Sequence, residues 1–411
     1  MTTALWPERR IGDLTTMGSG GTPPSKVSKY YGGGIPWVSI ADMTASTKYV
    51  RRTAKTLSAE GLAVSAARLY EPDVVLYAMY ASLGECAIAV GRVSSSQAIL
   101  GIQPGPSLDG EYLYYYLESI KEKIKTIGQQ GTQSNLNAGM VRDLRIQLPS
   151  IDEQRRISTA LRDADELIAI LERLIAKKQA IKQGMMQQLL TGRTRLPRFT
   201  GEWADIRLGD HVSYVKTVAL SRAQLDTKSP LKYLHYGDIH TRSSVILDSA
   251  SEEMPRASAK LAARAGLLQC GDLVFADASE DPAGVGKSVE IVSTPNTGVV
   301  PGLHTIAARF DKSVLADGFK AYLQFIPSFR DQLLRLAAGT KVLATTRSYI
   351  SSITLTLPGV AEQKAIAEAL HDSEREIEAL RVRLSKAQSI KTGMMQQLLT
   401  GRSRLPVEAA S

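Results

Sequence analysis

Two segments, GMMQQLLTGRTRLP at Gly184–Pro197 and GMMQQLLTGRSRLP at Gly393–Pro406, decide the fold of this 411-residue chain. Their first ten residues are identical, and the similarity continues upstream without a gap. Over Leu148–Pro197 and Leu357–Pro406, which lie 209 residues apart, 27 of 50 positions are identical. Self-similarity of this extent at one fixed separation indicates that the chain contains a duplicated structural unit.

Each repeat predicts one long helix with an apolar seam. At alternating spacings of four and three residues, the first seam consists of Ile157, Leu161, Ala164, Ile168, Leu171, Ile175, Lys178, Lys182, Met185 and Leu189. The second seam consists of Ile366, Leu370, Ser373, Ile377, Leu380, Leu384, Ala387, Lys391, Met394 and Leu398. A seam with this period needs a partner helix. We predict that the two helices pair antiparallel about a pseudo-twofold axis; the alternative is that each packs only on its own globular domain.

Residues at the ends of the repeats predict where the helices begin and end. Ser150 and Glu153 fit a capping box at the start of the first helix. Gly192 and Gly401 follow the last periodic leucines, where a left-handed residue commonly ends a helix. About 40 helical residues give a length of roughly 60 Å. The glycine that opens each quoted segment lies inside a helix, and we expect it to allow close approach of the partner helix.

The repeats divide the chain into five parts. These are a first globular head (residues 1–147), the first long helix (148–197), a second head (198–356), the second long helix (357–406) and a tail (407–411). Both heads contain short apolar strands and many glycines, and each contains one expected helix, near Glu111–Ile127 and Gly318–Ala338. The predicted fold class is α+β: two mixed α/β heads separated by an intramolecular antiparallel coiled coil.

The heads share an order of parts but little sequence identity. Trp6 and Trp203 open them, and each head ends with Gly-Thr followed by a short strand into Leu-Pro. The segment Pro72–Leu76 (PDVVL) resembles Gly271–Phe275 (GDLVF) when the two are aligned residue by residue. Near-identical helices beside divergent heads predict that the two heads have different specificities.

Composition narrows the class of partner and the compartment. The net charge of +9 favours a polyanionic partner, because neutralising phosphates releases counterions. Cys86 and Cys270 show no metal-ligand spacing and suit a reducing compartment. The N-terminus has no apolar stretch typical of a signal peptide. The most apolar window, Val74–Val90, is better explained by two short strands around a turn than by a membrane span, so we expect a cytoplasmic protein.

Motifs that would indicate catalysis are incomplete. Ala283–Ser288 resembles a phosphate-binding loop, but Asp281 stands where its first glycine is required, so a glycine-rich hairpin is expected. Asp73 and Glu85 resemble a metal-dependent nuclease core, but Ala87 stands where a lysine is needed. The five histidines lack zinc spacing. Neither an Asn-Pro-Pro-Tyr nor an Asp-Pro-Pro-Tyr motif is present, and these observations predict no catalytic centre, metal site or cofactor in this chain.

The chain resembles the specificity subunits of type I restriction–modification enzymes over essentially its whole length. In the first head, the motifs are Gly20–Pro23 (GGTP), Tyr31–Trp37 (YGGGIPW) and Gln133–Asn137 (QSNLN). In the repeats, they are the Leu-Pro and Glu-Gln pairs that open each helix and the Leu-Leu-Thr-Gly that closes it. The second head departs from this pattern, because it lacks the Gly-Gly-Thr-Pro opening and the Thr-Gln-Ser-Asn segment.

The resemblance implies a division of labour between this chain and its partners. Each head would be a target recognition domain that reads one half of a split double-stranded DNA site, and the helices would fix the unread spacer. It also implies two copies of an adenine methyltransferase subunit docked on the helices, with endonuclease (translocase) subunits joining them. S-adenosylmethionine would then belong to the methyltransferase partner, and ATP and Mg to the endonuclease partner.

Candidate DNA-contacting residues lie in loops rich in donors, acceptors and basic groups, which base and phosphate recognition requires. In the first head they are Thr22, Ser25, Lys26, Lys29, Tyr30, Tyr31, Lys48, Tyr49, Arg51, Arg52, Gln129, Gln130, Thr132, Gln133, Ser134 and Asn135. In the second head they are Lys216, Arg222, Tyr236, Thr241, Arg242, Lys287, Lys341, Thr345 and Arg347. For any one of them, the alternative is an ordinary solvated surface residue. Two other functions stay open: a solitary DNA-modifying enzyme, and a two-headed scaffold that binds proteins.

Overall fold

The structure is a computed structural model that describes residues 6–80, 82–129, 135–279, 281–337 and 343–406. Contacts divide the chain into two units. The first unit comprises Met1–Arg173 and Arg381–Ser411, and the second unit comprises Leu174–Leu380. Each unit therefore contains one head together with one part of each long helix.

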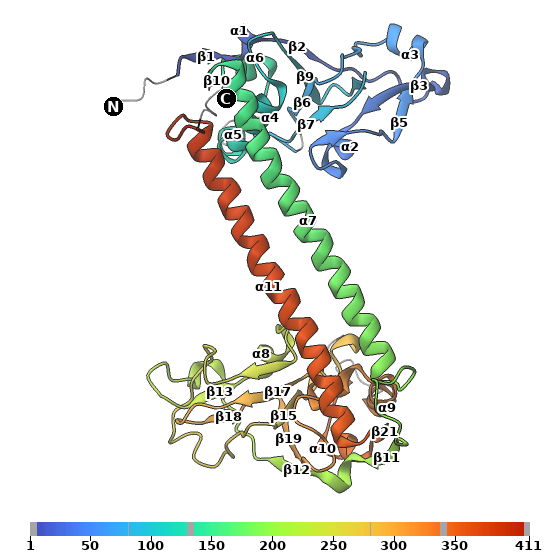
Figure 1. Ribbon diagram of the computed structural model, residues 1–411, viewed down its shortest axis with the longest axis vertical. Helices are drawn as coiled ribbons and strands as arrows, with labels where there is room; N and C mark the ends of the chain where they lie inside the picture. Colours follow the sequence, from blue (N-terminus) through green and yellow to red (C-terminus); the bar gives the residue numbers. More distant parts are fainter. Residues whose placement is uncertain (1–5, 81, 130–134, 280, 338–342, 407–411) are drawn as a thin grey trace. The chain divides into compact units, whose positions relative to one another are not determined.

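The two long helices form as predicted. They are α7 (Ile151–Leu189) and α11 (Val360–Leu398), each of 39 residues. Within each unit, their segments lie side by side and run in opposite directions (Figure 1). All seam positions are buried or half-buried, and at the ends of the seams Leu161 and Leu370 are fully buried in the core of a head. The helices thus pack on each other, as predicted, and the ends of their seams also pack on the heads, so the alternative that each helix packs only on its own head is excluded.

Lysines in the seam show the pseudo-twofold relation of the repeats. In the first unit, Lys391 Nζ lies 2.5 Å from the carboxylate of Asp165. In the second unit, Lys182 Nζ lies 3.0 Å from Glu374. Both members of one pair are 209 residues from their counterparts in the other, so the same interhelical contact is made twice. A third pair, Lys178 with Glu376 at 2.7 Å, occurs in the second unit alone, because its counterparts are Ala387 and Leu167.

The helix ends agree with the sequence, and the interior glycines do not. The Ser150 hydroxyl accepts a hydrogen bond from the Glu153 amide at 3.3 Å, which is the first of the two bonds of the predicted capping box. Gly192 and Gly401 have φ of +70°, as predicted for left-handed helix ends. The expectation of close helix approach at Gly184 and Gly393 is wrong, because a Cβ added at either would meet no atom within 4 Å.

Each head is built on a five-stranded mixed sheet of the same topology. In the first unit, the order is β2 (Thr15–Ser19), β9 (Ile99–Pro104), β6 (Val75–Ala78), β7 (Cys86–Ala89) and β4 (Tyr49–Val50). In the second unit, it is β12 (Val212–Val215), β19 (Thr305–Phe310), β15 (Leu273–Ala276), β17 (Ser288–Ser293) and β14 (Ile246–Asp248). In both sheets, the last pair is parallel and the others are antiparallel. The apolar window of the first head forms two strands, β6 and β7, as predicted.

The register of these sheets corrects the alignment of the heads by one residue. Val75 and Leu273 occupy the same position in their sheets. Each lies in the central strand, and its partners on the two neighbouring strands correspond between the heads. Asp73 is therefore equivalent to Gly271, and both have positive φ, +63° and +89°. The sequence comparison had matched Asp73 with Asp272. A slip of one residue exchanges the two faces of a strand, so the corrected pairing decides which side chains face the long helices.

Smaller elements complete both heads. Short sheets join β1 (Glu8–Arg10) to β10 (Arg145–Gln147), β11 (Ala204–Arg207) to β21 (Thr354–Leu357), and β13 (Lys232–Leu234) to β18 (Val299–Pro301). β3 (Tyr31–Val38) pairs with β5 (Lys55–Leu57) and β8 (Ser94–Ser95), and β16 (Ala278–Ser279) pairs with β20 (Leu343–Ala344). The short helices are α1 (Ile11–Leu14), α2 (Ile40–Ala45), α3 (Ala59–Ala63), α6 (Ala138–Asp143), α8 (Tyr236–His240) and α10 (Arg347–Ser352), with 3-10 turns at Ser28–Tyr30, Leu208–His211, Arg222–Gln224 and Pro282–Gly284. The glycine-rich segment before β17 thus contains a 3-10 turn.

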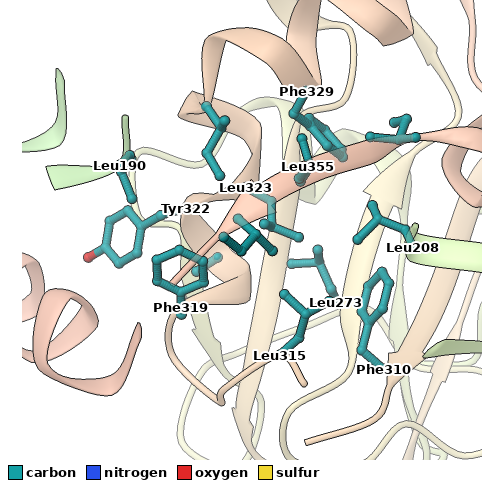
Figure 2. Packing of buried hydrophobic residues seen from close by; sticks show 14 of the residues in the cluster. Leu190, Leu208, Leu273, Phe310, Leu315, Phe319, Tyr322, Leu323, Phe329 and Leu355 are labelled. Atoms are coloured by element: carbon teal, nitrogen blue, oxygen red, sulfur yellow. The ribbon is translucent and has the colours of Figure 1, made fainter. Parts of the chain in front are cut away.

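Each predicted head helix is interrupted once. The first is divided into α4 (Gly110–Ser119) and α5 (Lys121–Gln129). The second consists of a 3-10 helix, η5 (Lys320–Phe325), followed by α9 (Pro327–Ala337). Pro327 has no amide hydrogen to donate, which explains why a new helix starts there. Figure 2 shows Phe319, Tyr322 and Leu323 of this region packed in the core of the second head. Among the described residues, no helix combines the length and apolarity needed to cross a membrane.

A tryptophan packs on a helix-ending glycine in both units. In the second unit the two residues belong to one loop, and in the first unit they lie near opposite ends of the chain. In the second unit, Trp203 packs on Gly192, and the Arg195 guanidinium lies over its ring at 5.7 Å. In the first unit, Trp6 packs on Gly401, and the Arg404 guanidinium lies over its ring at 5.5 Å. The same loop therefore closes each half, although in the first unit the indole and the glycine belong to opposite ends of the chain.

This arrangement predicts that the ends can be joined. Five residues connect Pro197 to Trp203, whereas fusing Ser411 to Met1 would place ten residues between the corresponding proline and tryptophan. We expect such a fusion, opened between Thr200 and Gly201, to fold with a free energy of unfolding within about 1 kcal/mol of the original, since longer loops cost little. Urea unfolding followed by circular dichroism measures this. The same fusion opened inside β6 is the control and should not fold; equal loss in both would contradict the prediction.

Candidate nucleic-acid interface

The second head presents a short helix, α8, whose start is fixed by side chains. Nδ1 of His235 accepts a hydrogen bond from the Gly237 amide at 3.1 Å, and the Asp238 carboxylate accepts one from the His235 amide at 3.1 Å. Burial lowers the pKa of His235, which keeps the imidazole neutral and able to accept. His235 is therefore a capping residue, and α8 is held in place half-buried against β15.

A basic cleft lies at the end of α8. It has a volume of about 470 Å³, and we call it the α8 cleft; its charged lining consists of three cations, Arg242, Lys287 and Arg330, and one carboxylate, Asp281, beside His240, Ser243 and Ser279. The Lys287 ammonium donates to the carbonyl of His240, which joins the loop before β17 to α8. Arg242 pairs with Glu252 and also donates to the Ile246 carbonyl at 3.3 Å. Cations held in this way can bind the phosphates of a nucleic acid.

Aromatic rings connect the α8 cleft to the loop before β19. The Tyr236 ring meets the His240 ring edge-on at 6.1 Å and the His304 ring edge-on at 5.4 Å. Nδ1 of His304 lies 3.1 Å from Oδ1 of Asp277, which follows β15 directly. Side chains from three separate segments therefore form one polar and aromatic surface.

The structure brings five of the predicted second-head residues to α8. Tyr236, Thr241 and Arg242 belong to the helix and the loop after it, and Lys287 lines the cleft. The guanidinium of Arg222 lies 4.0 Å from the position of a Cβ added at Gly237, so it flanks the start of the helix.

The remaining predicted residues of the second head lie elsewhere. Lys216 is exposed beyond β12, and the Arg347 guanidinium covers the Tyr214 ring at 5.5 Å. Lys341 lies outside the described residues. The burial of Thr345 argues against a DNA contact, because this residue is 5% exposed and its amide donates to the Asp277 carbonyl.

Three residues of this surface escaped the sequence analysis. His240 and His304 had been considered only as metal ligands, and Arg330 had not been considered. One signal was available, since His240 directly precedes the selected Thr241. His304 gave none, because its partners Tyr236 and Asp277 are distant in sequence. Within the described ranges, no three His, Cys, Asp or Glu side chains are grouped in a way that could hold a metal ion.

In the first head, the glycine-flanked loop is fixed to its surroundings. Thr22, Ser25 and Lys26 are exposed. Lys29 is paired with Glu60 at 2.5 Å, and the Tyr31 hydroxyl donates to the Pro23 carbonyl at 2.7 Å, while Tyr30 is half-buried. Polar groups are thus presented on an ordered loop, which suits base or phosphate contact.

The predicted basic strip of the first head contains both exposed and buried side chains. Arg51 and Arg52 are exposed and remain available to DNA. Lys48 is 7% exposed, its ammonium lies 3.2 Å from the Glu111 carboxylate and 3.1 Å from the Tyr115 hydroxyl, and burial lowers its pKa. The Tyr49 hydroxyl donates to Glu111. This burial argues against a contact between Lys48 and DNA, and Tyr49 is turned inward with it.

The predicted amide-rich loop is described only at its edges. Gln130, Thr132, Gln133 and Ser134 lie outside the described residues. Gln129 is the last residue of α5, and Asn135 is exposed. After the loop, the Leu136 amide donates to the Met79 carbonyl at 3.0 Å. This bond corresponds to the one from Thr345 to Asp277 in the second head. In both heads, the segment after the loop therefore bonds to the residue that follows the central strand of the sheet.

Sequence comparisons connect the chain to known proteins. Residues 4–181 match the family described as type I restriction modification DNA specificity domain. The MjaVIII specificity subunit of a type I restriction enzyme from Methanocaldococcus jannaschii is 25% identical over 421 aligned residues, covering 97% of this chain and 93% of the relative. The MjaIX specificity subunit from the same organism is 28% identical over 166 residues, which are 40% of this chain and 38% of that relative.

Solved structures share the fold over nearly the full length. The S subunit of a type I restriction–modification system from M. genitalium has a TM-score of 0.58 at 13% identity, with 97% of each chain covered. The HsdS subunit from Thermoanaerobacter tengcongensis has a TM-score of 0.54 at 16% identity, covering 97% of this chain and 98% of that one. A chain from a study of complex assembly in the type I system has a TM-score of 0.60 at 16% identity, covering 98% and 99%. With its duplicated helices and paired heads, this chain is similar to type I restriction–modification specificity subunits in sequence and in fold.

Proposed function

We propose that this chain reads a bipartite DNA sequence, with one half-site bound by each head. The observation that carries the proposal is the repeated five-stranded sheet, which has one strand order in both heads but different side chains in its loops. A repeated scaffold with divergent loops fits two binding sites of one kind and two specificities. The basic α8 cleft and the net charge of +9 support a DNA partner.

The paired helices give this function its geometry. In this proposal, heads attached through antiparallel helices would meet the two DNA strands in opposite senses. Domains that read half-sites on one face of B-DNA are separated by about one helical turn, ~34 Å, or multiples of it. The helices would therefore fix the length of the unread spacer between the half-sites.

The chemistry belongs, in this proposal, to partner subunits. Two adenine methyltransferase subunits would dock on the two repeats, and endonuclease subunits would join them. S-adenosylmethionine would be bound by the methyltransferase, and ATP and Mg by the endonuclease, so this chain would have no catalytic centre. Two repeats that share 27 of 50 residues support two docking sites for one partner. A DNA-reading subunit of this kind would work in the cytoplasm.

Exchanging one head tests the function. We expect that replacing residues 1–147 with the head of another family member, in complex with the methyltransferase partner, changes one half of the methylated motif and leaves the other half unchanged. The measurement is a genome-wide map of methylated adenines before and after the exchange. A change in both halves would contradict independent reading by the heads.

The two alternative functions give different results. A solitary DNA-modifying enzyme would methylate or cut DNA as the purified chain alone. A protein-binding scaffold would bind a cognate duplex without the salt dependence that phosphate contacts impose, or not at all in the presence of the methyltransferase. Each result is distinct from partner-dependent methylation at a split motif.

A further inference from the structure

We propose that His304 is a base-reading residue of the second head, and this inference rests on the proposed function. His304 has a φ of +56°, which is a left-handed backbone conformation that residues other than glycine seldom adopt. Such a conformation costs free energy and persists where the surroundings enforce it, typically at functional sites. The side chain that it presents is 52% exposed.

The imidazole of His304 is held in one orientation. Its Nδ1 lies 3.1 Å from Oδ1 of Asp277, and the edge-on contact with Tyr236 places the ring centroids 5.4 Å apart. The Asp277 amide also donates to the His304 carbonyl at 3.1 Å, which fixes the backbone. In its neutral form, a histidine that donates through Nδ1 presents Nε2, on the opposite side of the ring, as an acceptor.

An acceptor fixed in this way matches one class of base edge. In the major groove, the amino groups of adenine and cytosine are donors, whereas guanine presents two acceptors. His304 would therefore favour adenine or cytosine at its position. Because the side chain is already fixed before DNA binds, little of its conformational freedom is lost on binding, and this increases discrimination between bases.

The α8 cleft supplies the complementary contact. Tyr236 links His304 to His240, and the His240 carbonyl accepts from the Lys287 ammonium. Lys287 carries a charge that suits a phosphate, which positions DNA without reading its sequence. The two residues thus predict separable effects on one half-site.

The first head has other side chains at the corresponding positions, and the left-handed backbone of His304 is not repeated at its counterpart, Ala98. There the Met79 amide donates to the Ala98 carbonyl at 2.9 Å, which corresponds to the bond from Asp277 to His304. Ile40 follows the capping residue of α2, as Tyr236 follows that of α8. A polar, oriented trio in one head therefore replaces an apolar trio in the other. This difference is what reading two different half-sites requires.

The test uses the chain in complex with its methyltransferase partner. The wild-type motif is first mapped from methylated adenines, and duplexes carrying every single-base change are then compared. We expect His304→Asn, whose side chain tolerates a left-handed backbone, to lower discrimination about 10-fold at one base pair of the second half-site. The first half-site should be unaffected. Lys287→Met is the matched control and should weaken binding to all sequences alike while reducing the salt slope by about one.

Each outcome decides the inference. Unchanged discrimination at every position of the second half-site, or equal weakening for all sequences, would overturn the role of His304 while the split wild-type motif still supported two reading heads. A wild-type complex that methylates no split motif would instead overturn the proposed function. If His304→Asn does not fold, His304→Gly relieves the backbone conformation, and the same relaxed position is expected.

Discussion

Replacing Lys48 with methionine is expected to lower the free energy of unfolding of the first head by about 3 kcal/mol and to leave sequence recognition unchanged. The ammonium lies 3.2 Å from Glu111 and 4.3 Å from the centroid of the Tyr115 ring, with the rings of Tyr49 and Tyr114 also within 6 Å. Removing it leaves the Glu111 carboxylate near a buried surface with a weaker set of partners. The loss of one member of such a pair costs more than the pair contributes, because the other charge stays desolvated.

Hydrogen exchange on peptides that cover β4 and α4 measures this loss locally. Arg52→Met is the matched control, because it removes a neighbouring exposed cation, and it should change stability by less than about 0.5 kcal/mol. The double variant Lys48→Met with Glu111→Gln should recover part of the loss. A stable Lys48→Met protein with weakened DNA binding would restore Lys48 to the list of DNA contacts and contradict the buried assignment.

Lys48 also shows where the sequence misleads. In the printed sequence it stands in a strip of basic and aromatic residues, and such a strip is typical of a nucleic-acid surface. The partners that hold Lys48 are Glu111 and Tyr115, which lie more than 60 residues away in the sequence. The sequence alone does not tell which face is covered by α4. The site on α8 was only partly predicted for the same reason, since Tyr236, Asp277 and His304 meet through tertiary contacts.

Features that depend on local pattern were predictable. The heptad spacing predicts both long helices and their pairing, and the left-handed conformation of Gly192 and Gly401 follows from their place after the last apolar positions. The shared plan of the heads was visible, but its register was not. A one-residue difference changes few letters in an alignment, whereas it changes every hydrogen-bonded pair in a sheet.

The corrected register leads to Glu290, whose counterpart in the first head is Ile88. Both lie opposite equivalent residues of the central strands, and both amides bond the residue before the last strand of the sheet. Glu290 is 1% exposed, and its carboxylate accepts from the amides of Gly318 at 2.7 Å and Ala321 at 2.9 Å. The buried Lys320 ammonium is 3.8 Å away. Desolvation outweighs these partners and raises the pKa of Glu290 to about 7.

The second head should therefore lose stability as the pH rises from about 4.5 to about 7. The folded state favours the protonated carboxyl, so its contribution is complete below the unfolded pKa and is lost as the pH passes the folded one. At 1.36 kcal/mol per pKa unit, the change is about 3 kcal/mol. In Glu290→Gln the side chain no longer titrates. The free energy of unfolding of this variant, relative to that of wild type, should therefore rise by that amount between pH 4.5 and pH 8. The amide group of the glutamine does replace one acceptor oxygen by a donor. Hydrogen exchange of β17 at a series of pH values measures the difference, and comparison of the two proteins cancels the titration of the histidines.

Glu253→Gln, at a side chain 92% exposed, should show no such slope. Parallel pH profiles for wild type and Glu290→Gln would mean that the carboxylate is already charged at pH 5 and that its amide partners outweigh burial.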